Sequence, residues 1–120
     1  MLQVDAPELF GECYGAAAHL ALRHLLPAGS RVRLARDPAL EDRDRHGRLL
    51  RYVSLGAASV NLELVRRGAA APYFYRRLRG RHSDELLRAA RSAVAARRGL
   101  WRACPRARLN PNRLLETGPP

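Results

Sequence analysis

The sequence predicts a single α+β domain, mainly β with helices, in which strands at the start of the fold are lacking. A chain of 120 residues has the length of one domain. Hydrophobic residues make up 47% of it, enough for a core, which excludes wholesale disorder. The expected order is strand remnant, helix, strand, strand, helix, helix. Two strands and a remnant are too few for a sound sheet, so either the fold is mostly helical or early strands are missing, and we favour the second.

The first elements follow from residue patterns. Residues 2–4 indicate a strand remnant, and residues 5–8 a turn. Residues 12–26 are rich in alanine and leucine at helical spacing, and a proline and a glycine close this helix. Residues 31–36 alternate polar and apolar side chains, which is typical of a half-buried strand.

The middle of the chain adds a strand and a helix. Residues 37–47 are charged and rich in turn formers, and residues 49–55 predict the next strand. After a turn at residues 56–59, residues 60–67 predict a short helix. Gly68 can end this helix in the left-handed conformation.

The last third contains one further helix. Residues 69–75 are expected to be extended or irregular. Ser83 can cap a helix over residues 84–98, because acidic residues follow it and arginines occupy the last turn; Gly99 stops the helix. Residues 105–120 are rich in proline and arginine without apolar periodicity, and are expected to form a loose tail.

The charge balance indicates a polyanionic partner. The formal net charge is +11, from 22 basic residues, all of them arginine, against 11 acidic ones. Arginine binds phosphate oxygens in a bidentate manner and stays charged at any relevant pH. Nucleic acid is the first candidate partner and an acidic membrane surface the second. The exclusive use of arginine is weaker evidence than the charge, because codon bias in a GC-rich genome also produces it.

Several classes of protein are disfavoured. No run approaches the roughly 18 apolar residues of a membrane span, and the first residues lack the pattern of a signal peptide. The histidines and cysteines show no zinc-ligand spacing. Cys13 and Cys104 flank helices and no other cysteine competes, so we predict that they pair in an oxidising compartment; two free thiols are the alternative.

Three segments carry side chains suited to phosphate chemistry. Asp5 and Glu8 flank a proline in a turn, which suits a hard cation such as Ca²⁺ or is an ordinary acidic turn. The second segment surrounds Asp44 with arginines, which makes either a charged hairpin turn or a phosphate site. The third is an aromatic run beside arginines, which either stacks bases or packs in the core. The candidate contacts in the last two segments are Arg43, Arg45, Arg48, Tyr73, Phe74, Tyr75, Arg76 and Arg77.

Five segments form an ordered set: Val4–Glu8, Glu12–Gly15, Asp42–Val53, Val60–Ala69 and Ala89–Trp101. Each motif alone is weak, but their order and separations resemble the thermonuclease, or staphylococcal-nuclease-like, family over about residues 2–104. The resemblance implies a domain over residues 1–104 that is incomplete at its N-terminus. It also implies an OB-type five-stranded barrel with three helices.

The resemblance further implies a Ca²⁺-dependent phosphodiesterase that acts on DNA or RNA as a monomer. It gives Asp5 and the backbone carbonyl of Ala6 as calcium ligands. Glu8 matches the general base that activates the attacking water, and Arg48 matches the cation that stabilises the charge on phosphorus. Tyr73 and Tyr75 match the family's nucleotide-contacting tyrosines to within one residue of register, and His46 stands near the nucleotide where a tyrosine is usual.

The sequence also departs from the family pattern. The family has an upstream D-G-D-T strand, whose aspartate binds calcium, and an arginine shortly before the acidic turn; this sequence shows neither. We therefore expect the 120-residue chain to be poorly soluble and nearly inactive, and an upstream-extended chain to be active. A secreted parent protein is favoured, and the alternative function is a non-catalytic nucleic-acid-binding module of the same fold.

Overall fold

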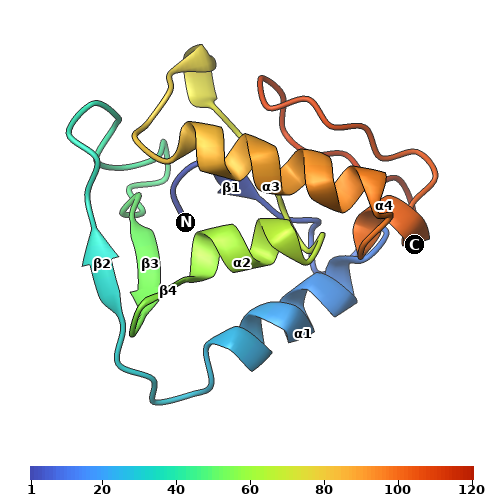
Figure 1. Ribbon diagram of the computed structural model, residues 1–120, viewed down its shortest axis with the longest axis horizontal. Coiled ribbons are helices and arrows are strands. Elements are labelled where there is room, and N and C mark those ends of the chain that lie inside the picture. Colours follow the sequence, from blue (N-terminus) through green and yellow to red (C-terminus); the bar gives the residue numbers. More distant parts are fainter.

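The computed structural model describes all 120 residues and contains short strands and four α-helices (Figure 1). The helices are α1 (Gly15–Leu25), α2 (Val60–Arg66), α3 (Ser83–Ala95) and α4 (Leu100–Ala103), with a 3₁₀ turn at Tyr75–Arg77. The strands are β1 (Val4–Asp5), β2 (Arg33–Ala35), β3 (Tyr52–Leu55), β4 (Ala58–Ser59) and β5 (Ala71–Pro72). No helix has the length and apolar character needed to cross a membrane.

The strands form two small antiparallel sheets rather than a closed barrel. β1 pairs with β5, and β2, β3 and β4 form a sheet in that order. The implied five-stranded barrel is therefore not observed. The physical reason is length: β3 is the longest strand with 4 residues, too short to wrap around a core and meet a distant edge.

The main hydrophobic core lies where α1 and α3 pack against α2, with β3 beside α2. Figure 1 shows α2 and α3 side by side across the middle of the molecule, with the β2–β3–β4 sheet at the left and α1 below. The apolar positions of the expected helices supply this core. Its buried members are Ala18, Val60, Leu64, Val65, Ala69, Ala70, Leu86 and Ala90.

Two glycines fix how the helices end. Gly68 follows α2 with φ of 70°, the left-handed conformation predicted for it. Gly99 also has positive φ, but α4 begins directly after it, so this glycine connects two helices. The two backbones touch, and a Cβ on either glycine would collide with the other segment. α3 begins one residue earlier than expected, with His82 rather than Ser83 at the N-cap.

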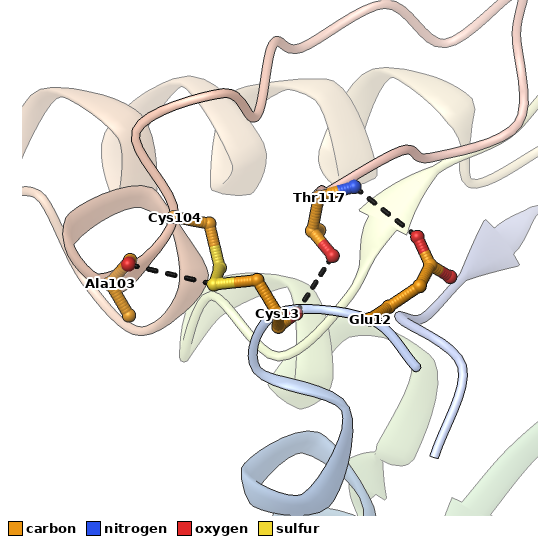
Figure 2. Close-up of a disulfide and its surroundings, with 5 residues drawn as sticks. All are labelled: Glu12, Cys13, Ala103, Cys104 and Thr117. Carbon is orange, nitrogen blue, oxygen red and sulfur yellow. Dashed lines mark hydrogen bonds between the residues drawn. A yellow bond between two sulfur atoms is a disulfide. The ribbon is translucent and has the colours of Figure 1, made fainter. Parts of the chain in front are cut away.

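The predicted disulfide is present and joins the start of α1 to the end of α4. Cys13 and Cys104 are bonded, with a Cα–Cα distance of 5.9 Å across 91 positions of sequence. Figure 2 shows the bond together with the C-terminal segment that crosses it. The Cys13 sulfur lies 3.5 Å from the Ala103 carbonyl oxygen, which is a contact without a donated proton because a disulfide sulfur carries none.

Residues 105–120 differ from the loose tail that the sequence predicts. They form no helix or strand, yet Ala107, Leu115 and Thr117 are buried. The Thr117 hydroxyl donates to the Cys13 carbonyl at 2.7 Å (Figure 2). The Cys13 N–H donates to the Gly118 carbonyl at 2.8 Å. Backbone hydrogen bonds of this kind hold a segment without apolar periodicity.

A buried carboxylate ties the β2–β3 sheet to the segment before α3. Asp37 is 3% exposed; its Oδ2 accepts hydrogen bonds from the Tyr52 hydroxyl at 2.7 Å and the Arg81 N–H at 3.0 Å. Burial alone would raise the pKa of Asp37, but these hydrogen bonds, with one from Ala39, together outweigh it and lower the pKa. Burial and the Asp37 carboxylate raise the pKa of Tyr52.

We expect Asp37→Asn to lower the free energy of unfolding by about 1–3 kcal/mol at pH 7, because buried donors lose a charged acceptor. A lowered native pKa means that the unfolded chain binds the proton first as pH falls. The contribution is therefore present above the ordinary aspartate value near 4 and disappears at lower pH. Urea unfolding of both proteins at pH 7 and pH 3 measures it. The exposed Glu41→Gln is the control; an equal loss at both pH values would contradict the assignment.

Candidate active site

The β1–β5 ladder positions the first candidate residues. Asp5 lies opposite Ala71, and Val4 opposite Pro72. The Tyr73 N–H then donates to the Gln3 carbonyl at 2.9 Å, which continues the pairing beyond β5. Because the strands are antiparallel, Asp5 and Tyr73 stand at opposite ends of this short ladder.

The acidic turn after β1 leaves Glu8 free. The Glu8 N–H donates to Glu12 Oε1 at 2.8 Å, while the exposed Glu8 side chain has no hydrogen bond or ion pair. Gly15, at the start of α1, contacts the Glu8 backbone so closely that a Cβ there would collide with its carbonyl. The glycine thus lets α1 support the turn, and the Glu8 carboxylate remains available to accept a proton.

Asp5 is half-buried and is already engaged by the C-terminal segment. Its Oδ2 accepts a hydrogen bond from the Leu115 N–H at 2.8 Å. Burial raises the pKa of Asp5, the nearby charges of Glu12 and Glu8 add to this, and the Leu115 hydrogen bond opposes it without cancelling it. The sequence did not predict this contact, because a backbone donor in an irregular segment leaves no residue pattern.

The oxygen donors at this turn fall short of a calcium site. Calcium takes about six to eight oxygen ligands. The candidates here are the Asp5 carboxylate and the Ala6 carbonyl, and no three or more histidine, cysteine, aspartate or glutamate residues gather where they could hold a metal. The residues present do not fit the ion without further ligands, so no chemical step is derived through it.

The charged turn is a hairpin organised by Asp44. Its Oδ1 accepts the backbone N–H groups of His46 and Arg48, and its Oδ2 accepts Arg48 Nε at 2.7 Å. Burial alone would raise the pKa of Asp44, but the hydrogen bonds outweigh it and lower the pKa. The Arg43 guanidinium donates to the Gly47 carbonyl at 2.9 Å, which closes the turn.

Arg48 is held at one edge and open at the other. Its side chain is 76% exposed, and Nε is the one group of the guanidinium with a partner. The terminal N–H groups face solvent in an orientation fixed by Asp44. Such a guanidinium can bind two phosphate oxygens. Arg45 contacts only the neighbouring His46, at 3.3 Å from Nε to Nε2.

The aromatic segment divides between core and surface. Phe74 is 1% exposed and belongs to the core, whereas Tyr75 is 50% exposed. The rings of Tyr73 and Tyr75 lie 6.5 Å apart, and the Arg76 guanidinium stands 5.3 Å from the Tyr75 ring. Arg76 and Arg77 both have positive φ. Arg76 thus lies over one face of the exposed Tyr75 ring, which combines an aromatic surface with a cation as single-stranded nucleic acid binding uses them.

The N-terminal residues connect these segments through buried polar contacts that sequence reasoning missed. Gln3 donates from Nε2 to the Leu78 carbonyl at 2.8 Å and accepts from the Gly80 N–H at 3.1 Å. Asn61 donates to the Leu2 carbonyl at 2.8 Å and accepts from the Val53 N–H. The order Val60-Asn61 within the family-like motif was the one signal for it. No hydrogen bond or ion pair joins Glu8 directly to Arg48.

Comparisons with known proteins bear on what these clusters do. A family model described as staphylococcal nuclease homologue matches residues 1–103. The chain is 32% identical over 107 residues to a thermonuclease from Staphylococcus hyicus. That match covers 84% of this chain and 60% of the relative, so the chain spans about 60% of the relative's length.

Proposed function

The chain belongs to the staphylococcal nuclease homologue family, and on that premise we propose that it carries the groups that hydrolyse phosphodiester bonds of DNA or RNA, with full activity in an upstream-extended form. The strongest support is that two side chains of suitable chemistry are free to act on a phosphodiester. Glu8 offers a free carboxylate, and Arg48 offers free terminal N–H groups on a guanidinium that Asp44 orients. A binding module needs no such base, whereas hydrolysis does.

In the proposed reaction, Glu8 takes a proton from a water molecule, whose oxygen attacks phosphorus. The bond from phosphorus to the leaving ester oxygen breaks, and that oxygen takes up a proton from solvent. Arg48 stabilises the charge on the equatorial oxygens as it develops. Tyr73 and Tyr75 hold the nucleotide by stacking, and Arg76 and Arg77 contact neighbouring phosphates.

The proposed hydrolysis depends on calcium, and the ion needs ligands in addition to those that this turn offers. Asp5 and the Ala6 carbonyl would supply two of the oxygens, and the rest would come from outside the described residues or from substrate and water. We further propose that the two small sheets belong to an OB-type arrangement of strands. A secreted, monomeric protein acting outside the cytosol is consistent with the Cys13–Cys104 disulfide.

A non-catalytic nucleic-acid-binding module is the second candidate. The single metal-binding carboxylate and the hydrogen bond from Leu115 to Asp5 favour it for the chain as it stands. A labelled single-stranded oligonucleotide, incubated with the upstream-extended chain and calcium and then run on both native and denaturing gels, separates the two functions. A shifted band with shortened products supports the nuclease, and a shifted band with intact oligonucleotide supports the module.

Nucleic-acid binding is expected to weaken steeply with salt. Arginine–phosphate contacts release counterions, and the candidates are Arg43, Arg45, Arg48, Arg76, Arg77 and Arg79. For four to six contacts we expect a slope of log K against log salt of about −3.5 to −5.5 on duplex DNA. Fluorescence anisotropy between low and moderate salt measures it. An affinity that does not change with salt would contradict a phosphate-led mode.

A further inference from the structure

A groove between α2 and α3 collects four arginines that lie outside the acidic turn, the charged turn and the aromatic segment. Its volume is about 610 Å³, and it is lined by Leu62 and Ala89 at its apolar floor. α2 and α3 pack against each other along this face (Figure 1). The charged and polar lining residues are Arg66, Arg67, Arg88, Arg98, Glu85 and Ser92.

Arg98 is held across the groove by both helices. Its Nε donates to the Arg66 carbonyl at 2.8 Å, and its Nη2 donates to the Ser92 hydroxyl at 2.9 Å. A guanidinium fixed in this way loses little side-chain entropy when it binds an anion. Its remaining Nη1 group has no partner and is free for a ligand.

The other arginines leave the groove with an excess of positive charge. Arg88 is exposed and makes no ion pair or hydrogen bond. Arg66 and Arg67 share Glu63, at 2.7 Å and 3.8 Å, and Glu63 lies outside the lining. Glu85 is the one carboxylate that lines the groove. Four arginines against one carboxylate suit a ligand with several adjacent anionic groups.

We propose that this groove binds the phosphate backbone of a nucleic acid, as a second contact surface separate from the candidate active site. The choice of nucleic acid over another polyanion rests on the proposed function. The groove itself recognises phosphate through arginine forks. It lengthens the stretch of nucleic acid that the protein holds beyond the segment that reacts.

The test compares salt dependence in two matched double variants. Arg67→Gln/Arg88→Gln removes two groove charges, and Arg91→Gln/Arg102→Gln removes two exposed charges outside the groove. Binding of a labelled 20-base-pair duplex is measured across salt. The groove variant is expected to flatten the slope of log K against log salt by about 1.8, which is about 0.9 for each lost phosphate contact. The control is expected to flatten it by less than half as much.

Equal effects of the two variants would overturn the proposal. The single variant Arg88→Gln controls for unfolding, because the Arg88 side chain makes no hydrogen bond or ion pair that the substitution could break. It is expected to flatten the slope of log K against log salt by about 0.9. A labelled polyglutamate peptide forms the second arm. Groove-dependent binding of the peptide without groove-dependent binding of DNA would overturn the assignment to nucleic acid. In the upstream-extended chain, groove-dependent DNA binding without cleavage would uphold the groove and contradict the proposed hydrolysis, whereas cleavage without groove dependence would do the reverse.

Discussion

Replacing Glu8 with glutamine or Arg48 with alanine is expected to lower the turnover rate of a nuclease-active form of the chain by at least about 10²-fold. Glutamine keeps the size of Glu8 but cannot take a proton from water. Alanine removes the guanidinium that Asp44 orients, and leaves the equatorial oxygens without that cation. Both substitutions fall at exposed positions, so neither disturbs the core.

Nucleic-acid binding is measured together with turnover, because both residues are proposed to stabilise the transition state rather than the bound substrate. Nucleic-acid affinity is expected to change much less than turnover for both variants. Glu41→Gln is a suitable control, since it removes an exposed carboxylate from outside the site. A fall in affinity that accounts for the whole loss of turnover would assign both residues to binding rather than to chemistry.

Loss of the Cys13–Cys104 disulfide is the second large effect that we expect. The bond closes a loop across 91 positions. The chain-entropy treatment gives about 4–5 kcal/mol for a loop of this length, through a more restricted unfolded state. Replacing both cysteines with serine is expected to lower the free energy of unfolding by about that amount. It also loosens residues 117 and 118, which hydrogen bond to the Cys13 backbone (Figure 2).

Urea unfolding with and without reductant measures the disulfide's effect. Reduction is expected to shift the midpoint of the native protein and leave that of the serine variant unchanged. Cys13→Ser alone should match the double variant, because either change removes the bond. Two titratable thiols in protein purified without reductant would contradict the pairing.

The helices were predictable because their signals are local. The alanine- and leucine-rich run became α1, the short run before Gly68 became α2, and the acidic start near Ser83 became α3. The strands were less predictable, because their partners are distant in sequence. β5 lies in a segment expected to be extended or irregular, and its partner β1 is more than sixty positions away in the sequence. α4 was missed because Gly99 suggests a stop, whereas its close contact with Gly68 makes it a connection between helices.

In the candidate site too, local contacts were predictable from the sequence and distant contacts were not. The arginines around Asp44 indicated either a charged hairpin turn or a phosphate site, and the bonds from the backbone and side chain of Arg48 to Asp44 form the turn. The aromatic run was expected either to stack bases or to pack in the core, and Phe74 is in the core. The Leu115 contact with Asp5 could not be predicted, since a backbone N–H from 110 positions away leaves no signature in either segment.

Glu8 and Arg48 are proposed to perform phosphodiester hydrolysis when the calcium ligands are complete. The most direct measurement adds an N-terminal segment bearing the family's D-G-D-T strand to the chain and follows release of acid-soluble nucleotides from DNA and RNA, with calcium and with chelator. We predict calcium-dependent release by the extended chain, at least about 10²-fold less by its Glu8→Gln form, and almost none by the 120-residue chain. Equal release by the extended chain and its Glu8→Gln form, or no release by either, would contradict the account.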